Sequence, residues 1–274
     1  MKRKILVYVM IVPLCLVWLL PVWTSLLVAF KNCDDYARQS FWQLPSQWYF
    51  LENMKYAWTT ANLGGYFVNS LVYAVTGAVG SIIFASLASF SIARLRPRGS
   101  NLLFALIFSG TVFPFQMYLV PLFQAYQELN LYDTKLGMML FYIAICTPFA
   151  TLIFRAFFST IPDELMEAAR LDGCSDLRIY CQVFMPLSLP AAAVVAVFQF
   201  TWVWNDLLFG LILTSSAKTR PIMVGLAQLQ GVRAGANVPG LMAGAVIASL
   251  PTIALFIALR KYFIQGLALQ TVGE

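Results

Sequence analysis

The chain has 274 residues, of which 60% are hydrophobic and 11% are charged, and its formal net charge is +6. A soluble domain carries about a quarter charged residues, so this composition excludes an ordinary water-soluble protein and predicts an integral membrane protein. The basic residues stand at the ends of apolar runs and form no basic face, which excludes nucleic acid as the partner.

Six apolar runs approach or exceed the length of about 20 residues that a membrane-spanning helix needs. The first follows Lys2-Arg3-Lys4 and is longer than the apolar core of a signal peptide, about 7–15 residues, so we expect it to be retained. The third contains Pro114 and Pro121, and Asn205-Asp206 interrupts the fifth. We therefore expect one all-α transmembrane domain over residues 1–274, with spans over about 5–30, 66–93, 101–123, 136–154, 187–213 and 241–259.

Six spans place both termini on one side of the membrane. Eleven of the 18 Lys and Arg residues fall on the terminal side, and the positive-inside rule then predicts cytoplasmic termini. Two segments on the other side are long: 31–65, whose aromatic residues indicate an interfacial helix or loop, and 214–240.

A dense polar stretch, residues 163–182, lies on the predicted cytoplasmic side. Thr160 with Asp163 fits the start of a capped helix, with Pro162 in its first turn, and Gly173 suits the left-handed residue that ends it. Ser175 then begins a second helix, which stops near Pro186. These helix start and stop signals alone favour an ordinary solvent-exposed loop that contains two capped helices.

The spacing within this stretch changes the interpretation. Glu167-Ala168-Ala169, then Gly173, then Val183-x-Met185-Pro186 resembles the EAA signature of membrane (permease) subunits of bacterial ABC importers, with Val and Met replacing Ile and Leu. Further resemblance to the binding-protein-dependent sugar importers of the maltose-permease type lies in NSL at 69–71, ARLRPRG at 93–99, VPLF at 120–123, LNLYDTKLG at 129–137 and WND at 204–206. The final residues depart from the tail of that type, which puts a contact between the tail and the ATPases in doubt.

The resemblance implies an all-α integral membrane fold with six transmembrane helices and coupling helices over 161–186 in a cytoplasmic loop. It implies a subunit of an ATP-driven importer in the bacterial plasma membrane, forming half of the path for an oligosaccharide, a monosaccharide or a glycerol-phosphate-like solute. Its partners would be a second permease subunit, two ATPase subunits and an extracytoplasmic solute-binding protein. The chain would bind no cofactor and no metal, and ATP and Mg would lie in the ATPases. The residues implied to couple to the ATPase are Asp163, Leu165, Glu167, Ala168, Ala169, Asp172, Gly173 and Pro186.

Other residues have two interpretations. Asp206 is an acidic residue within a predicted span, so it is a candidate for the translocation path. We favour the alternative, in which Asp206 forms hydrogen bonds inside the helix bundle. The same alternatives apply to Asn69 and Asn205. By resemblance, the outer segment containing Gly225, Gln228, Gln230 and Gly231 contacts the binding protein; otherwise it is a plain connecting loop.

The chain lacks the G-x-x-x-x-G-K-[ST] phosphate loop, so it is not itself the ATPase of the importer. Two other classes of function are weighed against an importer subunit. A self-sufficient secondary transporter or channel would show repeated halves and several intramembrane ionisable groups, and neither is evident. A membrane enzyme is disfavoured because the chain has no histidine and Asp206 is the lone acid within its predicted spans.

Overall fold

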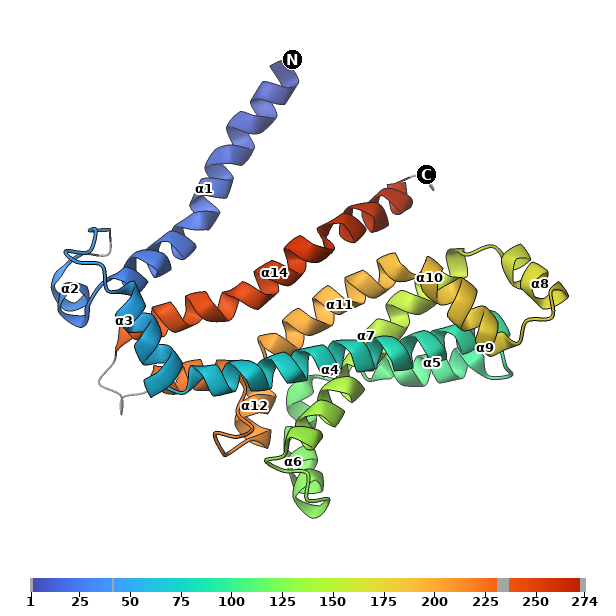
Figure 1. The fold of residues 1–274 in the computed structure, drawn as a ribbon. Helices are drawn as coiled ribbons and strands as arrows, with labels where there is room; N and C mark the ends of the chain where they lie inside the picture. The colour runs from blue at the N-terminus through green and yellow to red at the C-terminus, as the bar shows by residue number, and fades with distance from the viewer. Residues whose placement is uncertain (1, 41, 231–236, 272–274) are drawn as a thin grey trace. The chain divides into compact units, whose positions relative to one another are not determined.

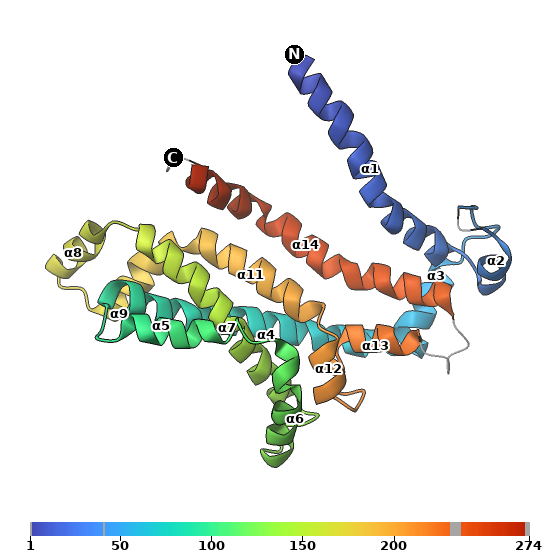
Figure 2. The same cartoon turned by 180° about the vertical axis from the view of Figure 1, so that it is seen from behind.

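The computed structural model describes residues 2–40, 42–230 and 237–271, with side chains described between 7 and 261. The regular secondary structure within these residues is helical (Figures 1 and 2). The long helices are α1 (Lys2–Phe30), α4 (Leu63–Phe90), α7 (Lys135–Thr160) and α14 (Val238–Thr271). Each of these four is long and apolar enough to cross a membrane.

A fifth candidate span is bent. One arm runs from Asp176 to Leu187 and comprises α9 (Asp176–Ile179), the π-helical turn η4 (Tyr180–Phe184) and α10 (Met185–Leu187). The other arm is α11 (Leu189–Trp204), and the two meet at 73°. Apolar side chains remain exposed on the helices, as on α1, where Trp18 is 76% exposed. A lipid-facing surface needs such side chains, because lipid tails offer no hydrogen bonds.

Two predicted spans differ from the structure. The run 101–123 is a broken segment: α5 (Ser100–Ser109), a turn, the 3₁₀ helix η3 (Phe115–Tyr118) and α6 (Leu119–Glu128). Pro114 has ψ 126°, and a proline can donate no hydrogen bond to continue a helix. The run 187–213 is likewise split into α11 and α12 (Leu208–Leu213) by residues 205–207.

The chain divides into two compact units. The first contains residues 1–67 and 224–250, including α2 (Cys33–Arg38), α3 (Phe50–Lys55) and the π-helical turn η1 (Tyr56–Thr60). The buried amide of Asn53 donates to the carbonyls of Ala29 and Lys31 at 2.9 and 2.7 Å. These bonds satisfy carbonyls at the end of α1 that the helix leaves without a partner.

The second unit contains residues 68–223 and 251–274. Its core joins one end of α4 to α7, α8 (Asp163–Leu171), η4 and α11 through the buried residues Ala85, Phe90, Ala150, Phe154, Phe158, Ile161, Met166, Ile179, Tyr180, Phe184, Ala191 and Val195. Small and hydroxyl side chains on α4 allow close packing: Ser89 donates to the carbonyl of Thr151 at 3.0 Å, and Ser86 bonds to Tyr180 at 2.7 Å. Figures 1 and 2 show α8 and α9 at one end of this helix bundle.

Candidate functional site

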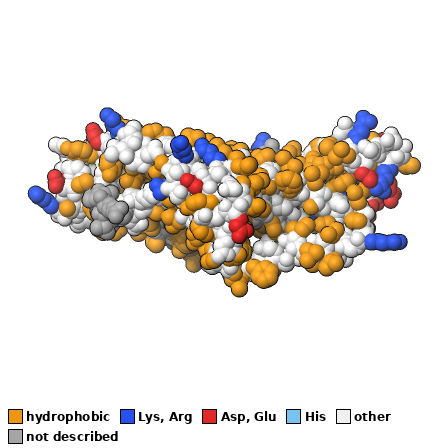
Figure 3. Space-filling view, turned by 90° about the horizontal axis from the view of Figure 1, so that it is seen from below, with side chains coloured by type: hydrophobic (Ala, Val, Ile, Leu, Met, Phe, Trp, Pro, Cys, Tyr) orange, Lys and Arg blue, Asp and Glu red, His pale blue; other side chains and the backbone are white. Residues whose placement is uncertain are grey.

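The first part of the polar stretch forms the short helix α8, and one face of this helix packs against the core. Met166 is buried, and Ala169 packs against the core cluster. Asp163, Leu165, Glu167 and Ala168 are exposed. The helix therefore presents both charged and apolar side chains outward, and Figure 3 shows acidic and basic side chains gathered at the end of the molecule that carries it.

A Schellman motif ends α8. Asp172 is the C-cap residue, Gly173 has φ +78°, and the amide of Cys174 donates to the carbonyl of Ala169 at 3.0 Å while that of Gly173 donates to Arg170 at 3.0 Å. The left-handed conformation predicted for Gly173 is confirmed. Ser175 caps the next helix, its hydroxyl accepting the amide of Arg178 at 3.4 Å.

The start of α8 differs from the prediction. Thr160 is the last residue of α7 and its hydroxyl donates to the carbonyl of Phe157, so it does not cap α8. The N-cap residue is Pro162, which offers no side-chain hydrogen bond. The carboxylate of Asp163 instead accepts from the guanidinium of Arg94.

The second helix ends at Leu187, close to the predicted end near Pro186. It continues through η4 and passes Pro186, which lies in the first turn of α10, where a proline is tolerated. The bend falls after it, at Ser188. Pro186 is exposed.

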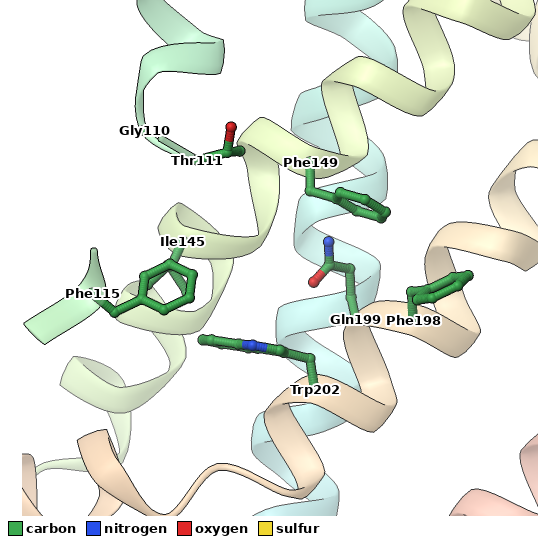
Figure 4. Close-up of a pocket in the computed structure, with 8 residues that line it drawn as sticks. All are labelled: Gly110, Thr111, Phe115, Ile145, Phe149, Phe198, Gln199 and Trp202. Atoms are coloured by element: carbon green, nitrogen blue, oxygen red, sulfur yellow. The ribbon is translucent and has the colours of Figure 1, made fainter. Parts of the chain in front are cut away.

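Two adjoining cavities lie beside α11, about 220 and 560 Å³ in volume. Phe115, Phe198 and Trp202 line both. Figure 4 shows these rings and Phe149 lining the smaller cavity, with the amide of Gln199 among them. Gln199 is buried and donates to the carbonyl of Cys146 at 3.2 Å.

The larger cavity adds polar groups at its edge. Thr201, Asn205 and Asp206 line it. Asp206 accepts from the hydroxyl of Tyr142 at 2.9 Å and from the amide of Gly210 at 3.1 Å, so its carboxylate also holds the start of α12. The amide of Asn205 donates to the carbonyl of Thr201 at 2.8 Å. Asp206 therefore forms a hydrogen bond within the helix bundle and also lines the larger cavity.

Asn69 lies elsewhere. It is 3% exposed, lines neither cavity, and donates to the carbonyl of Arg220 at 3.0 Å. Its neighbours on α4 bond to the same segment: Ser70 accepts the amide of Ile222 at 2.7 Å, and Tyr73 donates to the carbonyl of Thr219 at 2.8 Å.

The segment 214–240 is partly helical, since α13 spans Ile222–Leu229. Gly225 is buried, and a Cβ there would lie 2.2 Å from the Tyr66 ring, so packing explains this glycine. Gln228 and Gln230 are exposed, and Gly231 lies outside the described residues.

Asp133 anchors the beginning of this segment. Its carboxylate accepts from the amides of Ser215 and Ser216 at 2.9 and 3.1 Å and from the hydroxyl of Thr219. Partial burial acts to raise the pKa of Asp133, but the hydrogen bonds from Thr219 and the two serines outweigh it and hold the pKa well below its usual range.

Sequence reasoning missed several residues at these sites. Leu171 is 90% exposed on α8, but of the two leucines there the predicted coupling residues include only Leu165. Phe115 and Trp202 wall the cavities, yet aromatic residues in apolar runs are too common to signal a cavity. Arg94 was noted only as part of a basic turn, because its partners lie 64–69 residues further along the chain.

The described residues form helices, several of them long and apolar enough to cross a membrane, and this fold defines a multi-pass membrane protein. Residues 81–269 match the family described as "Binding-protein-dependent transport system inner membrane component", and the chain belongs to this family of permease components.

Two relatives and one solved structure extend the likeness. The chain is 33% identical over 271 residues to the "Osmoprotective compounds uptake permease protein GgtD" of Synechocystis sp., covering 97% of this chain and 91% of that protein. It is 32% identical over 250 residues to the "Melibiose/raffinose/stachyose import permease protein MelC" of Bacillus subtilis, covering 91% and 89%. A chain from the crystal structure of a bacterial ABC transporter involved in alginate import superposes with a TM-score of 0.83 at 24% identity over 96% of each chain, which shows the same fold.

Proposed function

We propose that this chain is the transmembrane subunit that forms half of the path of an ATP-driven carbohydrate importer, and that α8 docks on a separate ATPase subunit. The observation that carries the docking is the surface of α8: Leu171 is 90% and Leu165 is 43% exposed between charged residues. Apolar side chains rimmed by charges are typical of a protein contact. ATP and Mg would bind in the ATPase, because this chain has no phosphate loop.

The ATPase contact comprises Asp163, Leu165, Glu167, Ala168, Ala169, Asp172, Gly173 and Pro186. Exposed Ala168 allows close approach of a partner's backbone, while Glu167 fixes orientation. This docking requires α8 and both termini to face the cytoplasm, consistent with the basic residues at 94–98. The six-span count is also part of the proposal, with the broken segment 100–128 as the third span.

The carbohydrate substrate is supported by the relatives, one of which is described as importing melibiose, raffinose and stachyose. The cavities offer matching chemistry: the ring of Trp202 suits the apolar face of a sugar, and Asn205 and Asp206 offer hydrogen bonds to its hydroxyls. We place the translocation path along this wall. Because the family is binding-protein-dependent, exposed Gln228 and Gln230 are proposed to contact that protein.

Purification from native membranes tests this function. The tagged chain should retain a second permease subunit and an ATPase in stoichiometric amounts. The binding protein encoded with it should gain thermal stability with melibiose, raffinose or another sugar in a panel. Transport by the chain alone in vesicles, without ATP, would instead establish a self-sufficient secondary transporter or channel.

A further inference from the structure

Arg94 lies in the π-helical turn η2 (Ser91–Leu95), which continues α4. Its side chain is 3% exposed. The guanidinium donates to the carboxylate of Asp163 and to the carbonyls of Phe158 and Ile161. It also lies 5.3 Å from the centre of the Phe184 ring, in a cation–π contact. One side chain thus joins the end of α4 to the end of α7, the start of α8 and η4.

These partners give Arg94 a defined structural task. The carbonyls of Phe158 and Ile161 lie where α7 passes into α8. That of Phe158 also accepts from the amide of Ile161, the C-cap residue of α7, and carbonyls at a helix end need such partners from outside the helix. A buried cation is tolerated only when it is paired and hydrogen-bonded. The planar, forked guanidinium bonds several acceptors at once, which a lysine ammonium on its flexible stem does less well.

Aromatic packing strengthens the same junction. The ring of Phe90, at the end of α4, contacts Phe158, Tyr180 and Phe184 with centroid distances of 6.4, 5.5 and 5.1 Å. Both η2 and η4 are π-helical turns, a local form that is frequent at functional positions. Because interlocked side chains resist independent movement, α8 is expected to move together with this end of α4.

The other end of α4 is bonded as well. Asn69, Ser70 and Tyr73 hold the segment 219–222 through the three hydrogen bonds described above. Asn69 and Arg94 lie 25 residues apart along a nearly continuous helix, which corresponds to about 37 Å. The helix therefore has a bonded partner at each end: the α7–α8 junction and the segment that leads into α13.

We propose that Arg94 is a positioning residue that fixes α8 to α4, and that α4 carries the displacement of α8 to the segment 219–222. This rests on the proposed function, in which α8 docks on the ATPase and the outer segment meets the binding protein. Arg94 contacts neither partner itself. Its loss should reduce the stimulation of ATP hydrolysis by the binding protein, while the surface of α8 that touches the ATPase remains.

The test uses the complete complex in proteoliposomes, with the binding protein added outside. Three variants are compared with wild type: Arg94→Ala, Arg94→Lys and Asp163→Asn. Arg98→Ala is the matched control, since Arg98 is exposed in the connection between η2 and α5. Basal ATPase activity, its stimulation by the sugar-loaded binding protein, and the ATPase retained per permease are measured for each.

We expect Arg94→Ala to retain the ATPase but to lower the stimulation by about 2- to 30-fold, the range for residues that carry coupling between sites. Arg94→Lys should lie between Ala and wild type, because the charge remains opposite Asp163. Asp163→Asn should show a smaller loss, since the carbonyl bonds of Arg94 persist. In the double variant Arg94→Ala/Asp163→Asn the combined loss should be smaller than the sum of the two single losses, because both changes remove the same ion pair.

Wild-type stimulation in Arg94→Ala at wild-type protein levels would overturn the proposal. Should Arg94→Ala fail to insert, Arg94→Lys and Asp163→Asn decide: wild-type stimulation in both of these also overturns it. Failure of the proposed function is distinguishable, because the wild-type complex would then retain no ATPase or show no stimulation.

Discussion

Gly173 shows how one backbone conformation sets the geometry of the proposed docking site. Its φ of +78° lies in the left-handed region, and a Cβ there would meet no atom within 4 Å. The requirement for glycine is therefore conformational, not steric. The turn fixes the direction in which α9 leaves α8, and with it the exposed position of Leu171.

Substitutions at Gly173 should separate strain from hydrogen bonding. Gly173→Ala should cost about 1 kcal/mol, since an ordinary residue pays this in the left-handed region, whereas Gly173→Asn should cost less. Gly173→Pro should do more damage, because proline fixes φ near −65° and removes the amide that bonds Arg170. Thermal unfolding of the purified complex orders the three, and Gly173→Pro should also uncouple ATP hydrolysis from sugar uptake. Normal uptake by that variant would contradict the coupling role.

The hydrogen bonds of Asp133 predict that acid loosens the segment around residues 215–219. Its folded-state pKa is depressed, so the stabilisation from its hydrogen bonds is fully present above the unfolded pKa, about 3.9, and is lost as the pH falls below that value toward the folded pKa. Asp133→Asn should lower the unfolding temperature at pH 7, and the difference from wild type should shrink toward pH 3. Thermal unfolding in detergent from pH 7 to pH 3 measures it. A difference independent of pH would mean that the carboxylate's charge is not what holds the segment.

At the scale of elements, α8 is a short helix held by its core-facing side and open on the other. Met166 and Ala169 pack against the core, while Leu165 and Leu171 remain exposed. A helix of nine residues is too short to be stable alone, so its order derives from these contacts and from its ends. The helix α8 can therefore move together with the core that it packs against and remain helical.

Leu171→Asp should therefore release the ATPase without unfolding the chain. The side chain is 90% exposed, so the change removes little buried surface within the chain, but it places a charge in the proposed interface. The amount of ATPase that copurifies should fall, as it should for Glu167→Lys, whose charge is reversed. Leu129→Asp is the matched control, at 66% exposure away from α8. Equal retention in Leu171→Asp and the control would exclude Leu171 from the contact.

The sequence predicted the helices and turns that depend on residues close together in the chain. Uninterrupted apolar runs indicated α1, α4, α7 and α14, and Gly173 and Ser175 marked the turn between α8 and α9. The third run was misjudged because hydropathy counts apolar residues and does not weigh the break at Pro114. The junction around Arg94 lay beyond local reasoning, because a guanidinium finds its partners only when distant helices pack.

At the scale of the molecule, the proposed function requires a physical connection between the proposed solute path and the proposed docking surface. Within the second unit α11 carries the cavity wall at Trp202, and at its other end α11 follows the arm that begins after α8. The bend at Ser188 stands between them. Movement of α8 would therefore reach the cavity wall through α9, η4 and α11, whereas α4 leads to the segment 219–222.

Trp202 should accordingly affect the solute and leave ATPase docking unchanged. Trp202→Ala removes the ring that walls both cavities, and an aromatic contact of this kind corresponds to about a 2- to 10-fold loss. Sugar uptake by whole cells should fall by that factor at low sugar concentration, while Trp202→Phe retains most of the uptake. Trp18→Ala is the control, since Trp18 is 76% exposed and lines neither cavity. The copurified ATPase should be unchanged in all three variants, and a loss of the ATPase in Trp202→Ala would show that the ring supports the fold and not the path.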